Sequence, residues 1–261
     1  MIYINAFCTF VPKNRKIAMI SKTQIKFIRS LELKKNRRRE GLFVAEGPKV
    51  VNDFLQAGLR PNALFSTVER PDAQTVTGEE LHKISFLQHP QEVLGVFPIP
   101  DVVADSTPDP SQLSLALDGV QDPGNVGTII RIADWFGIGT VYCSPDTADV
   151  YNPKVVQATM GSLAHVRVIC CDLQQLLAQA SCPIYGTLLD GRDIYTQPLS
   201  PNGIIIMGNE GNGISPEIRA LVTHRLLIPN YNTGLRTAES LNVAIATAIT
   251  CAEFRRQHPI P

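Results

Sequence analysis

The chain has 261 residues, of which 44% are hydrophobic and 18% charged, and its formal net charge at pH 7 is zero. This length allows one large domain or two ordinary ones, and the composition is that of a soluble globular protein. No apolar run approaches the ~18 residues that a membrane-spanning helix needs, so the sequence predicts no membrane association. Residues 1–11 are apolar and the charges follow them, whereas a secretory signal peptide begins with basic residues. The sequence therefore predicts a cytoplasmic protein.

Cysteine spacing argues against both disulfides and a bound metal. The six cysteines are Cys8, Cys143, Cys170, Cys171, Cys182 and Cys251. No two of them form a C-x-x-C pair, and no histidine lies at zinc-ligand spacing from any of them. We expect all six to be reduced, most of them as small core residues, and we expect no metal site.

Positive charge is concentrated near the N-terminus. Residues 13–40 contain eleven Lys and Arg against two acidic residues, which gives this segment a net charge of +9 and the rest of the chain −9. Such a segment attracts polyanions, although most charge runs are only the solvated face of a helix. Within this segment, the dense basic run at residues 34–39 favours an RNA or DNA partner over that alternative. The candidate RNA contacts are the basic residues of this run, Lys34, Lys35, Arg37, Arg38 and Arg39.

Hydrophobic periodicity and helix-boundary residues predict a small α/β domain over residues 19–97. The predicted helices cover residues 21–33, 48–58 and 78–84, and the predicted strands cover residues 41–45, 63–65 and 93–97. Residues 98–112 contain four prolines and predict a fairly stiff linker, because proline fixes φ. We expect residues 1–18, which precede the first helical pattern, to be a dispensable extension.

Strand and helix signals alternate over residues 113–261, which predicts a mostly parallel sheet covered by helices. The predicted strands cover residues 113–117, 140–143, 166–169, 184–189, 204–207 and 226–229, and the predicted helices cover residues 128–136, 172–180 and 215–221, with further helices beginning at Asn152-Pro153 and after Ser240. Ligands of such sheets bind at the carboxyl ends of the strands. The glycine-rich turns at residues 119–127 and 208–213 both follow strands and are candidate ligand loops.

The turn at residues 208–213 does not have the pattern of a phosphate-binding loop. No Gly-Lys-Ser/Thr follows it, and its glycine spacing is the reverse of the dinucleotide fingerprint. That fingerprint also lies in the first βα turn of a domain, whereas this turn comes late in its domain. Glu210 in this turn would repel a phosphate, so a cationic or neutral ligand fits better. Most turns of this kind, taken alone, are only turns.

Ser240 is predicted to be the N-cap of the last helix, which is predicted to be buried because its residues are small and apolar. Asn242 would then lie near the buried start of this helix with an amide that needs hydrogen-bonding partners. A cap residue alone is usually only a cap. Polar groups at an apolar helix start, together with a glycine turn, indicate a site.

Three ordered motifs resemble those of the SpoU (TrmH-like) RNA ribose 2′-O-methyltransferases, of the knotted SPOUT class. Residues 122–131 (Asp-Pro-Gly-Asn-Val-Gly-Thr-Ile-Ile-Arg) resemble the first motif and residues 207–211 (Met-Gly-Asn-Glu-Gly) the second. Ile228-Pro229, followed by residues 240–244 (Ser-Leu-Asn-Val-Ala), resembles the third. The resemblance covers residues 113 to about 255, and a weaker one relates the N-terminal unit to the RNA-binding domain of many such enzymes.

This resemblance implies a trefoil-knotted α/β domain over residues 113–261, a homodimer, and S-adenosylmethionine as the methyl donor. A sulfonium cation agrees with the acidic turn. One departure is the segment of residues 230–239, a few residues longer than the usual loop of the family. This longer segment could alter the cofactor pocket or an RNA contact made by Arg236.

The resemblance also implies roles for individual residues. The expected catalytic residues are Asn125, Arg131, Glu210, Ser240 and Asn242, and the expected cofactor contacts are Thr187, Gly208, Gly211, Ile228 and Leu241. Without the family, Asn125 reads as a turn residue, Arg131 as a solvated helix residue and Ile228 as ordinary core.

The sequence thus predicts transfer of a methyl group from S-adenosylmethionine to a ribose 2′-hydroxyl of structured RNA, with ribosomal RNA favoured over transfer RNA. The alternative is a non-catalytic RNA-binding protein with a degenerate methyltransferase domain. A base methyltransferase of the related knotted class is a weaker rival. The motif residues count against the non-catalytic alternative, because each of them is present in the chain.

Overall fold

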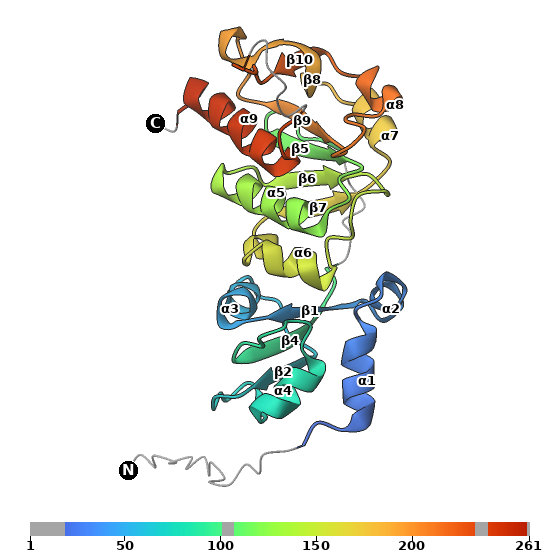
Figure 1. Cartoon of the computed structure of the whole chain (residues 1–261), viewed down its shortest axis with the longest axis vertical. Helices are drawn as coiled ribbons and strands as arrows, with labels where there is room; N and C mark the ends of the chain where they lie inside the picture. The colour runs from blue at the N-terminus through green and yellow to red at the C-terminus, as the bar shows by residue number, and fades with distance from the viewer. Residues whose placement is uncertain (1–18, 101–106, 233–239, 260–261) are drawn as a thin grey trace, which may run out of the picture.

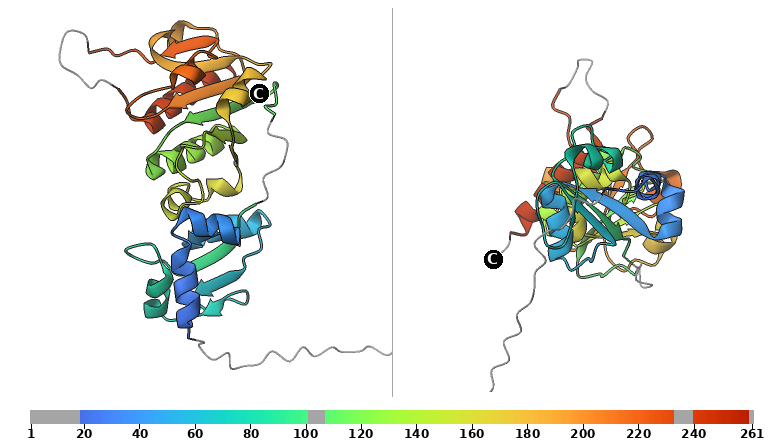
Figure 2. Two further views of the ribbon diagram at one scale, coloured as in Figure 1. Left: turned by 90° about the vertical axis from the view of Figure 1, so that its right-hand side faces the viewer. Right: turned by 90° about the horizontal axis from the view of Figure 1, so that it is seen from below.

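The computed structural model describes residues 19–100, 107–232 and 240–259. The predictions made for residues 1–18 and for Arg236 lie outside these residues. Two domains are stacked along the long axis of the molecule, the smaller one at the N-terminal end (Figure 1). Figure 2 shows the same stacking from the side.

The N-terminal domain is built on a four-stranded sheet of order β1-β4-β2-β3, in which β4 is antiparallel to β1 and β2. Its elements are α1 (Lys22–Ser30), α2 (Lys34–Glu40), β1 (Leu42–Glu46), α3 (Pro48–Gln56), β2 (Ala63–Ser66), β3 (Gln74–Thr75), α4 (Gly78–Ile84) and β4 (Val93–Pro98). A capping box of Ser21 and Gln24 begins α1. The basic run forms a helix of its own, α2, which Gly41 ends in the left-handed conformation at φ 64°.

The C-terminal domain contains a six-stranded, all-parallel sheet of order β10-β8-β9-β5-β6-β7, so the predicted sheet type is confirmed. Its elements are β5 (Leu113–Asp118), α5 (Pro123–Trp135), β6 (Thr140–Cys143), α6 (Pro153–Ala158), η1 (Ser162–Ala164), β7 (Arg167–Cys170), α7 (Leu173–Ala178), β8 (Ile184–Asp193), η2 (Ile194–Thr196), β9 (Gly203–Gly208), α8 (Pro216–Arg219), β10 (His224–Leu227) and α9 (Val243–Gln257).

Helices cover both faces of this sheet, and the central strand β5 is buried on both. Leu115 and Leu117 belong to the core that contains residues of α5 and α9, whereas Ala116 between them belongs to the core that contains residues of α7 and α8. This division follows from the two-residue period of a strand. Apart from Ser114 and its last residue, Asp118, β5 is apolar, as expected for a strand between two helical layers.

The helix α5 begins five residues earlier than the sequence predicts. Asp122 is its N-cap and accepts a hydrogen bond from the Asn125 backbone N–H, while Pro123 occupies the first helical position. Both are strong helix-start signals, and they outweigh the preference of the following glycines for a loop. Asn125 is therefore a first-turn helix residue and not a turn residue.

The N-cap of α9 is Asn242, so the prediction of Ser240 as the cap is wrong. The Asn242 side-chain oxygen accepts hydrogen bonds from the backbone N–H groups of Ala244 and Ile245. Asn242 is itself exposed, and so is Ile245. The predicted buried helix start therefore holds for Val243 and Ala244 but not for Asn242 or Ile245, and α9 carries an apolar side chain into solvent.

The two domains share one continuous hydrophobic core. Phe43 and Phe54 of the N-terminal domain belong to the same buried cluster as Val155 and Leu163 of the C-terminal domain. The ring of Phe43 lies 5.0 Å from that of Tyr151, measured between centroids. Burial raises the pKa of the Tyr151 hydroxyl to about 12. The two domains are thus packed directly against each other.

Candidate active site

The candidate site lies at the carboxyl edge of the parallel sheet, where β5 and β9 end side by side. Asp118, the last residue of β5, pairs in register with Gly208, the last residue of β9. The first and second motifs leave the sheet from these two positions. The topology therefore brings together loops that are some ninety residues apart in the chain.

The second motif forms a closed turn. Asn209 and Gly213 exchange two backbone hydrogen bonds of 2.9 Å each. The Asn209 side chain donates to the Gly119 carbonyl over 2.7 Å and so joins this turn to the first motif loop. Gly208 is buried, and a Cβ there would lie 2.2 Å from the Gly213 carbonyl carbon, so only glycine fits.

Three side chains from the three motifs form one hydrogen-bonded network. Asn242 donates through Nδ2 to Asn125 Oδ1 over 2.9 Å, and Asn125 donates through Nδ2 to Glu210 Oε1 over 3.0 Å. Glu210 also accepts from the backbone N–H groups of Gln121 and Asp122, at 3.2 and 3.3 Å. The first-motif loop thus holds the carboxylate by its backbone, and the three motif residues orient one another.

The Glu210 carboxylate is held in its ionised form. Burial would raise its pKa, but this effect is outweighed by hydrogen bonds from the Asn125 side chain and from backbone N–H groups, including those of Gln121 and Asp122, so the pKa is lowered. Because a lowered pKa favours the anion, the negative charge persists as the pH falls toward the ordinary range of glutamate. The site therefore presents a fixed anion to any ligand at this edge.

The other expected cofactor positions surround this edge. Thr187 lies on β8 beside the end of β9 and donates its hydroxyl to the Ile206 carbonyl over 3.3 Å. Ile228 packs against the main core from the end of β10, whereas Leu241, next to the network, is 51% exposed. Gly211 lies exposed in the closed turn, and its backbone N–H donates to the Asn209 side-chain oxygen. Ser240 is exposed just before the network.

Arg131 is not part of the network. It is exposed on α5, six residues after Asn125, which places the two side chains on different faces of the helix. Among the residues that the structure describes, no hydrogen bond or ion pair of Arg131 is found. Its guanidinium is therefore available to a ligand or to another chain.

The basic residues of α2 divide into two groups. Lys35, Arg38 and Arg39 are exposed and Lys34 is partly exposed, in keeping with their expected RNA contacts. The expectation is wrong for Arg37, whose side chain is only 2% exposed and is ion-paired with Asp149 of the C-terminal domain at 2.5 Å. A guanidinium buried in this way cannot reach a phosphate.

Sequence reasoning missed two contributors to the site. The Asn209 side chain hydrogen-bonds to both motif loops, and its oxygen accepts from backbone N–H groups of its own turn. Asn often makes such bonds in turns, so an Asn in a glycine-rich turn is a sequence signal for this role. Gln121 contributes through its backbone N–H alone, as Asp122 does toward Glu210, so their side chains gave no sign of this role.

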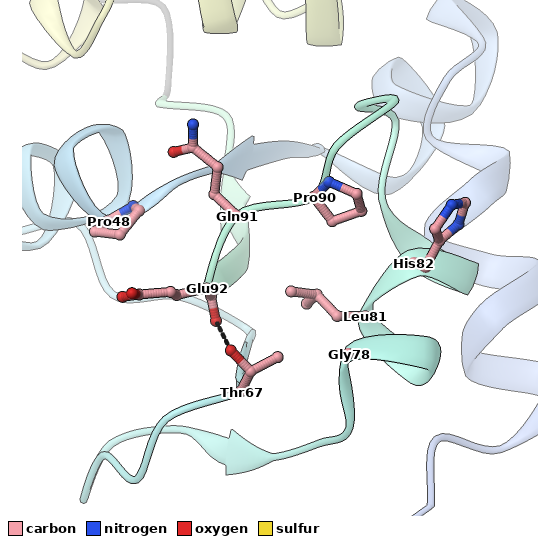
Figure 3. Close-up of a pocket in the computed structure, with 8 residues that line it drawn as sticks. All are labelled: Pro48, Thr67, Gly78, Leu81, His82, Pro90, Gln91 and Glu92. Atoms are coloured by element: carbon pink, nitrogen blue, oxygen red, sulfur yellow. Dashed lines mark hydrogen bonds between the residues drawn. The ribbon is translucent and has the colours of Figure 1, made fainter.

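Two cavities lie elsewhere. One, of about 490 Å³, is in the N-terminal domain, where Leu81 and Pro90 face Thr67, and Thr67 donates to the Glu92 carbonyl (Figure 3). The other, of about 330 Å³, lies beside β8 and β10 and includes Asp190. Neither is lined by a residue of the three motifs, so the hydrogen-bonded network defines the candidate active site.

Within residues 19–100, 107–232 and 240–259, no group of His, Cys, Asp or Glu is arranged to hold a metal ion. No helix in this part of the chain is both long and apolar enough to cross a membrane. The five cysteines among these residues are free.

Asn242→Ala is expected to weaken binding of the ligand at this edge and to destabilise the fold by about 0.5–2 kcal/mol, because an N-cap and a network member are lost together. Asp172→Ala removes the N-cap of α7, on the other face of the sheet, and is the matched control. Calorimetry should find weaker ligand binding for Asn242→Ala alone. Equal binding by both folded variants would remove Asn242 from the site.

Comparison with known families and proteins agrees with the motif assignment. The model of the SpoU rRNA Methylase family matches residues 112–252, and that of an MRM3-like substrate binding domain matches residues 22–95. A 23S rRNA (guanosine(2553)-2′-O)-methyltransferase of Bacillus subtilis is 29% identical over 92% of this chain and 99% of its own length.

Solved structures resemble both domains together. A putative RNA methyltransferase of the TrmH family from Porphyromonas gingivalis is 44% identical, with a TM-score of 0.79 over 92% of this chain and 100% of that one. An AdoMet-bound rRNA methyltransferase from Sinorhizobium meliloti is 32% identical, with a TM-score of 0.81 over 92% of this chain and 97% of that one. The predicted fold class, a trefoil-knotted α/β domain with a smaller N-terminal α/β domain, is confirmed. With a family model that matches more than half of its length, the chain belongs to the SpoU rRNA methylase family.

Proposed function

We propose that this protein is a cytoplasmic enzyme that transfers a methyl group from S-adenosylmethionine to a ribose 2′-hydroxyl of structured RNA, most readily ribosomal RNA. The observation that carries the proposal is the network of Asn125, Glu210 and Asn242, one residue from each motif. The name of the Bacillus subtilis relative supports a ribose in ribosomal RNA as the target. A non-catalytic RNA-binding protein would not need this network.

The residues at the carboxyl edge of the sheet fit S-adenosylmethionine. Gly208 leaves the backbone of the turn bare, and Leu241 offers an exposed apolar side chain. Glu210 supplies a negative charge, which favours a cation and repels phosphate. When bound, S-adenosylmethionine supplies an electrophilic methyl group on a positively charged sulfur. Thr187, Gly211 and Ile228 would complete its contacts.

The protein's own task is to position and activate the ribose. A ribose hydroxyl is a poor nucleophile until its proton is drawn away, so the site needs a base or a stabiliser of the developing alkoxide. Arginine stays protonated in almost any setting, and Arg131 therefore acts as a fixed cation that stabilises the oxyanion and holds an adjacent phosphate. Asn125 and Asn242, with Ser240 nearby, orient the reacting groups.

Methyl transfer from labelled S-adenosylmethionine to ribosomal RNA tests the proposal directly. A strain that lacks the gene should lose one ribose methylation, which mass-spectrometric mapping of its RNA would identify. RNA binding without cofactor binding would instead favour the non-catalytic alternative. A methyl group found on a base would favour the base methyltransferase.

The exposed basic residues of α2 are proposed to bind the RNA backbone. Replacing Arg38 and Arg39 together with glutamine should weaken RNA binding and lower the slope of log K against log salt by roughly one unit per lost phosphate contact. The control is Arg60→Gln, which removes an exposed charge outside α2. An unchanged slope in Arg38→Gln/Arg39→Gln would exclude this surface, and cofactor binding should stay at the wild-type level in either case.

We also propose a homodimer, through the outer faces of α5 and the start of α9. Trp135 is 85% exposed and Ile245 is 53% exposed. Large apolar side chains on two neighbouring helices favour a covering partner. A second copy over this face would also exclude water from Arg131, whose charge acts more strongly in a dry site.

Ile245→Asp is expected to convert this dimer to a monomer, because a carboxylate would be buried without a partner. Sedimentation measures the change of mass, and the fluorescence of Trp135, the only tryptophan of the chain, should shift to longer wavelength. Leu189→Asp is the control, since Leu189 is 79% exposed on β8. A wild-type protein that sediments as a monomer at micromolar concentration would overturn the dimer.

A further inference from the structure

Arg37 is the one basic residue of α2 that points into the protein. Its Nη1 donates to the carbonyl oxygens of Leu31 and Glu32, at 2.8 and 2.7 Å, and its Nη2 donates to Asp149 Oδ2 at 2.5 Å. The first two bonds fasten α2 to the end of α1, and the third fastens it to the C-terminal domain. Figure 1 shows α2 at the junction of the two domains.

Asp149 belongs to a loop that continues to the active site. This loop follows β6, the neighbour of β5 in the sheet, and it carries Ala148, whose backbone N–H donates to the Val120 carbonyl over 2.9 Å. Val120 directly precedes Gln121 and Asp122, the two residues whose backbone N–H groups hold Glu210. Asp149, the partner of Arg37 in the ion pair, is therefore the next residue after Ala148, which is hydrogen-bonded to the first-motif loop.

The Asp149 carboxylate is itself fixed in place. Its Oδ1 accepts from the Tyr151 backbone N–H over 3.2 Å, and the Tyr151 ring packs on Phe43 of the N-terminal domain. Both oxygens of Asp149 are thus used, one within its own loop and one across the domains. An ion pair in which both partners are fixed defines a distance and a direction between the parts it joins.

We propose that Arg37 is a positioning residue for methyl transfer. Through Asp149 and the loop that follows β6, it fixes the position of the basic face of α2 relative to the first-motif loop. RNA bound on α2 then presents its ribose to Glu210 and Asn125. The inference rests on the proposed function. It assigns Arg37 a role distinct from the RNA contact proposed for Arg38 and Arg39, because the contacts of Arg37 are with protein groups.

The consequence for catalysis follows from geometry. RNA held on one domain and reacted on the other is placed only as accurately as the two domains are placed. Misplacement of reacting groups by about 1 Å can cost on the order of 10²-fold in rate, even when the altered residue is distant. Loss of the Arg37 contact should therefore lower the rate at saturating RNA without changing how tightly RNA binds.

Two variants of the full-length protein test the proposal, and a third serves as the control. Asp149→Asn keeps the shape of the side chain but has one acceptor oxygen, so it cannot accept from both Arg37 and Tyr151. Arg37→Met removes the charge and all three of its hydrogen bonds. Asp72→Asn, the control, disrupts the ion pair with Arg70 inside the N-terminal domain. If Arg37→Met fails to fold, Asp149→Asn still decides the question.

Three measurements separate positioning from the other roles. Single-turnover methyl transfer at saturating RNA should be slower by about tenfold to hundredfold in Asp149→Asn and Arg37→Met. The salt slope of RNA binding and the affinity for S-adenosylmethionine should stay at wild-type values. Hydrogen exchange of the amides of residues 119–122 should become faster in both variants and not in Asp72→Asn.

Each contrary result overturns the proposal in a different way. A salt slope reduced as in Arg38→Gln/Arg39→Gln would make Arg37 an RNA contact. Wild-type single-turnover rates in folded Asp149→Asn would show that the contact does not position RNA. Unchanged exchange in residues 119–122 would disprove the coupling even if the wild-type protein methylated no RNA, so this measurement separates failure of the inference from failure of the proposed function.

Discussion

Replacing Arg131 with alanine should slow methyl transfer by about 10²–10³-fold, the usual cost of removing one electrostatic contact to a developing charge. S-adenosylmethionine binding should be unchanged, because Arg131 lies outside the network of Asn125, Glu210 and Asn242. Arg131→Lys keeps the charge but loses the planar fork that binds phosphate, so it should also be severely impaired.

Single-turnover kinetics at saturating RNA and cofactor measure this effect on the chemical step. The control is Arg192→Ala, which removes an exposed arginine of the same domain outside the three motifs. Wild-type turnover in Arg131→Ala would falsify the assignment. The group acting on the hydroxyl would then have to be sought at Glu210.

Gly208→Ala should weaken S-adenosylmethionine binding by about ten- to hundredfold, which corresponds to the usual ~1–3 kcal/mol cost of overpacking. The added Cβ would lie 2.2 Å from the Gly213 carbonyl carbon and 2.3 Å from the Ile214 nitrogen. Since these are backbone atoms, the turn must open. An opened turn loses the two bonds between Asn209 and Gly213 and moves Glu210 away from the first-motif loop.

Calorimetric titration with the cofactor tests this prediction. Gly139→Ala is the matched control, because a Cβ at Gly139 would meet no atom within 4 Å. Hydrogen exchange of residues 208–213 should be faster in Gly208→Ala only. Wild-type cofactor affinity in this variant would mean that the closed turn does not hold the cofactor.

Elements with local signals could be predicted from the sequence. The helix over residues 78–84 has the predicted bounds, since Thr77 and Glu80 form a capping box at its start. The observed start of α5, marked by Asp122 and Pro123, precedes the predicted one because the glycines around Asn125 favour a loop. The error has a physical source: glycine lowers helix propensity but does not prevent a helix whose first turn is capped.

The site was predictable only as far as the motifs reach. Asn125, Glu210 and Asn242 were named from a family resemblance, and the structure joins them although Asn125 and Asn242 are 117 residues apart. Arg37 had no such signal. Its neighbours in the sequence are basic and exposed, and its partner Asp149 is 112 residues away. A contact of this kind depends on the packing of the two domains, which periodicity and propensity do not encode.

The core shared by the two domains has a consequence for how the protein unfolds. Phe43 and Phe54 pack in one buried cluster with Val155 and Leu163, so neither domain can open without exposing apolar surface of the other. Cooperative units in proteins follow such contacts and not the boundaries of motifs. The chain should therefore melt in a single transition, and a fragment that ends in the proline-rich segment should aggregate when expressed alone.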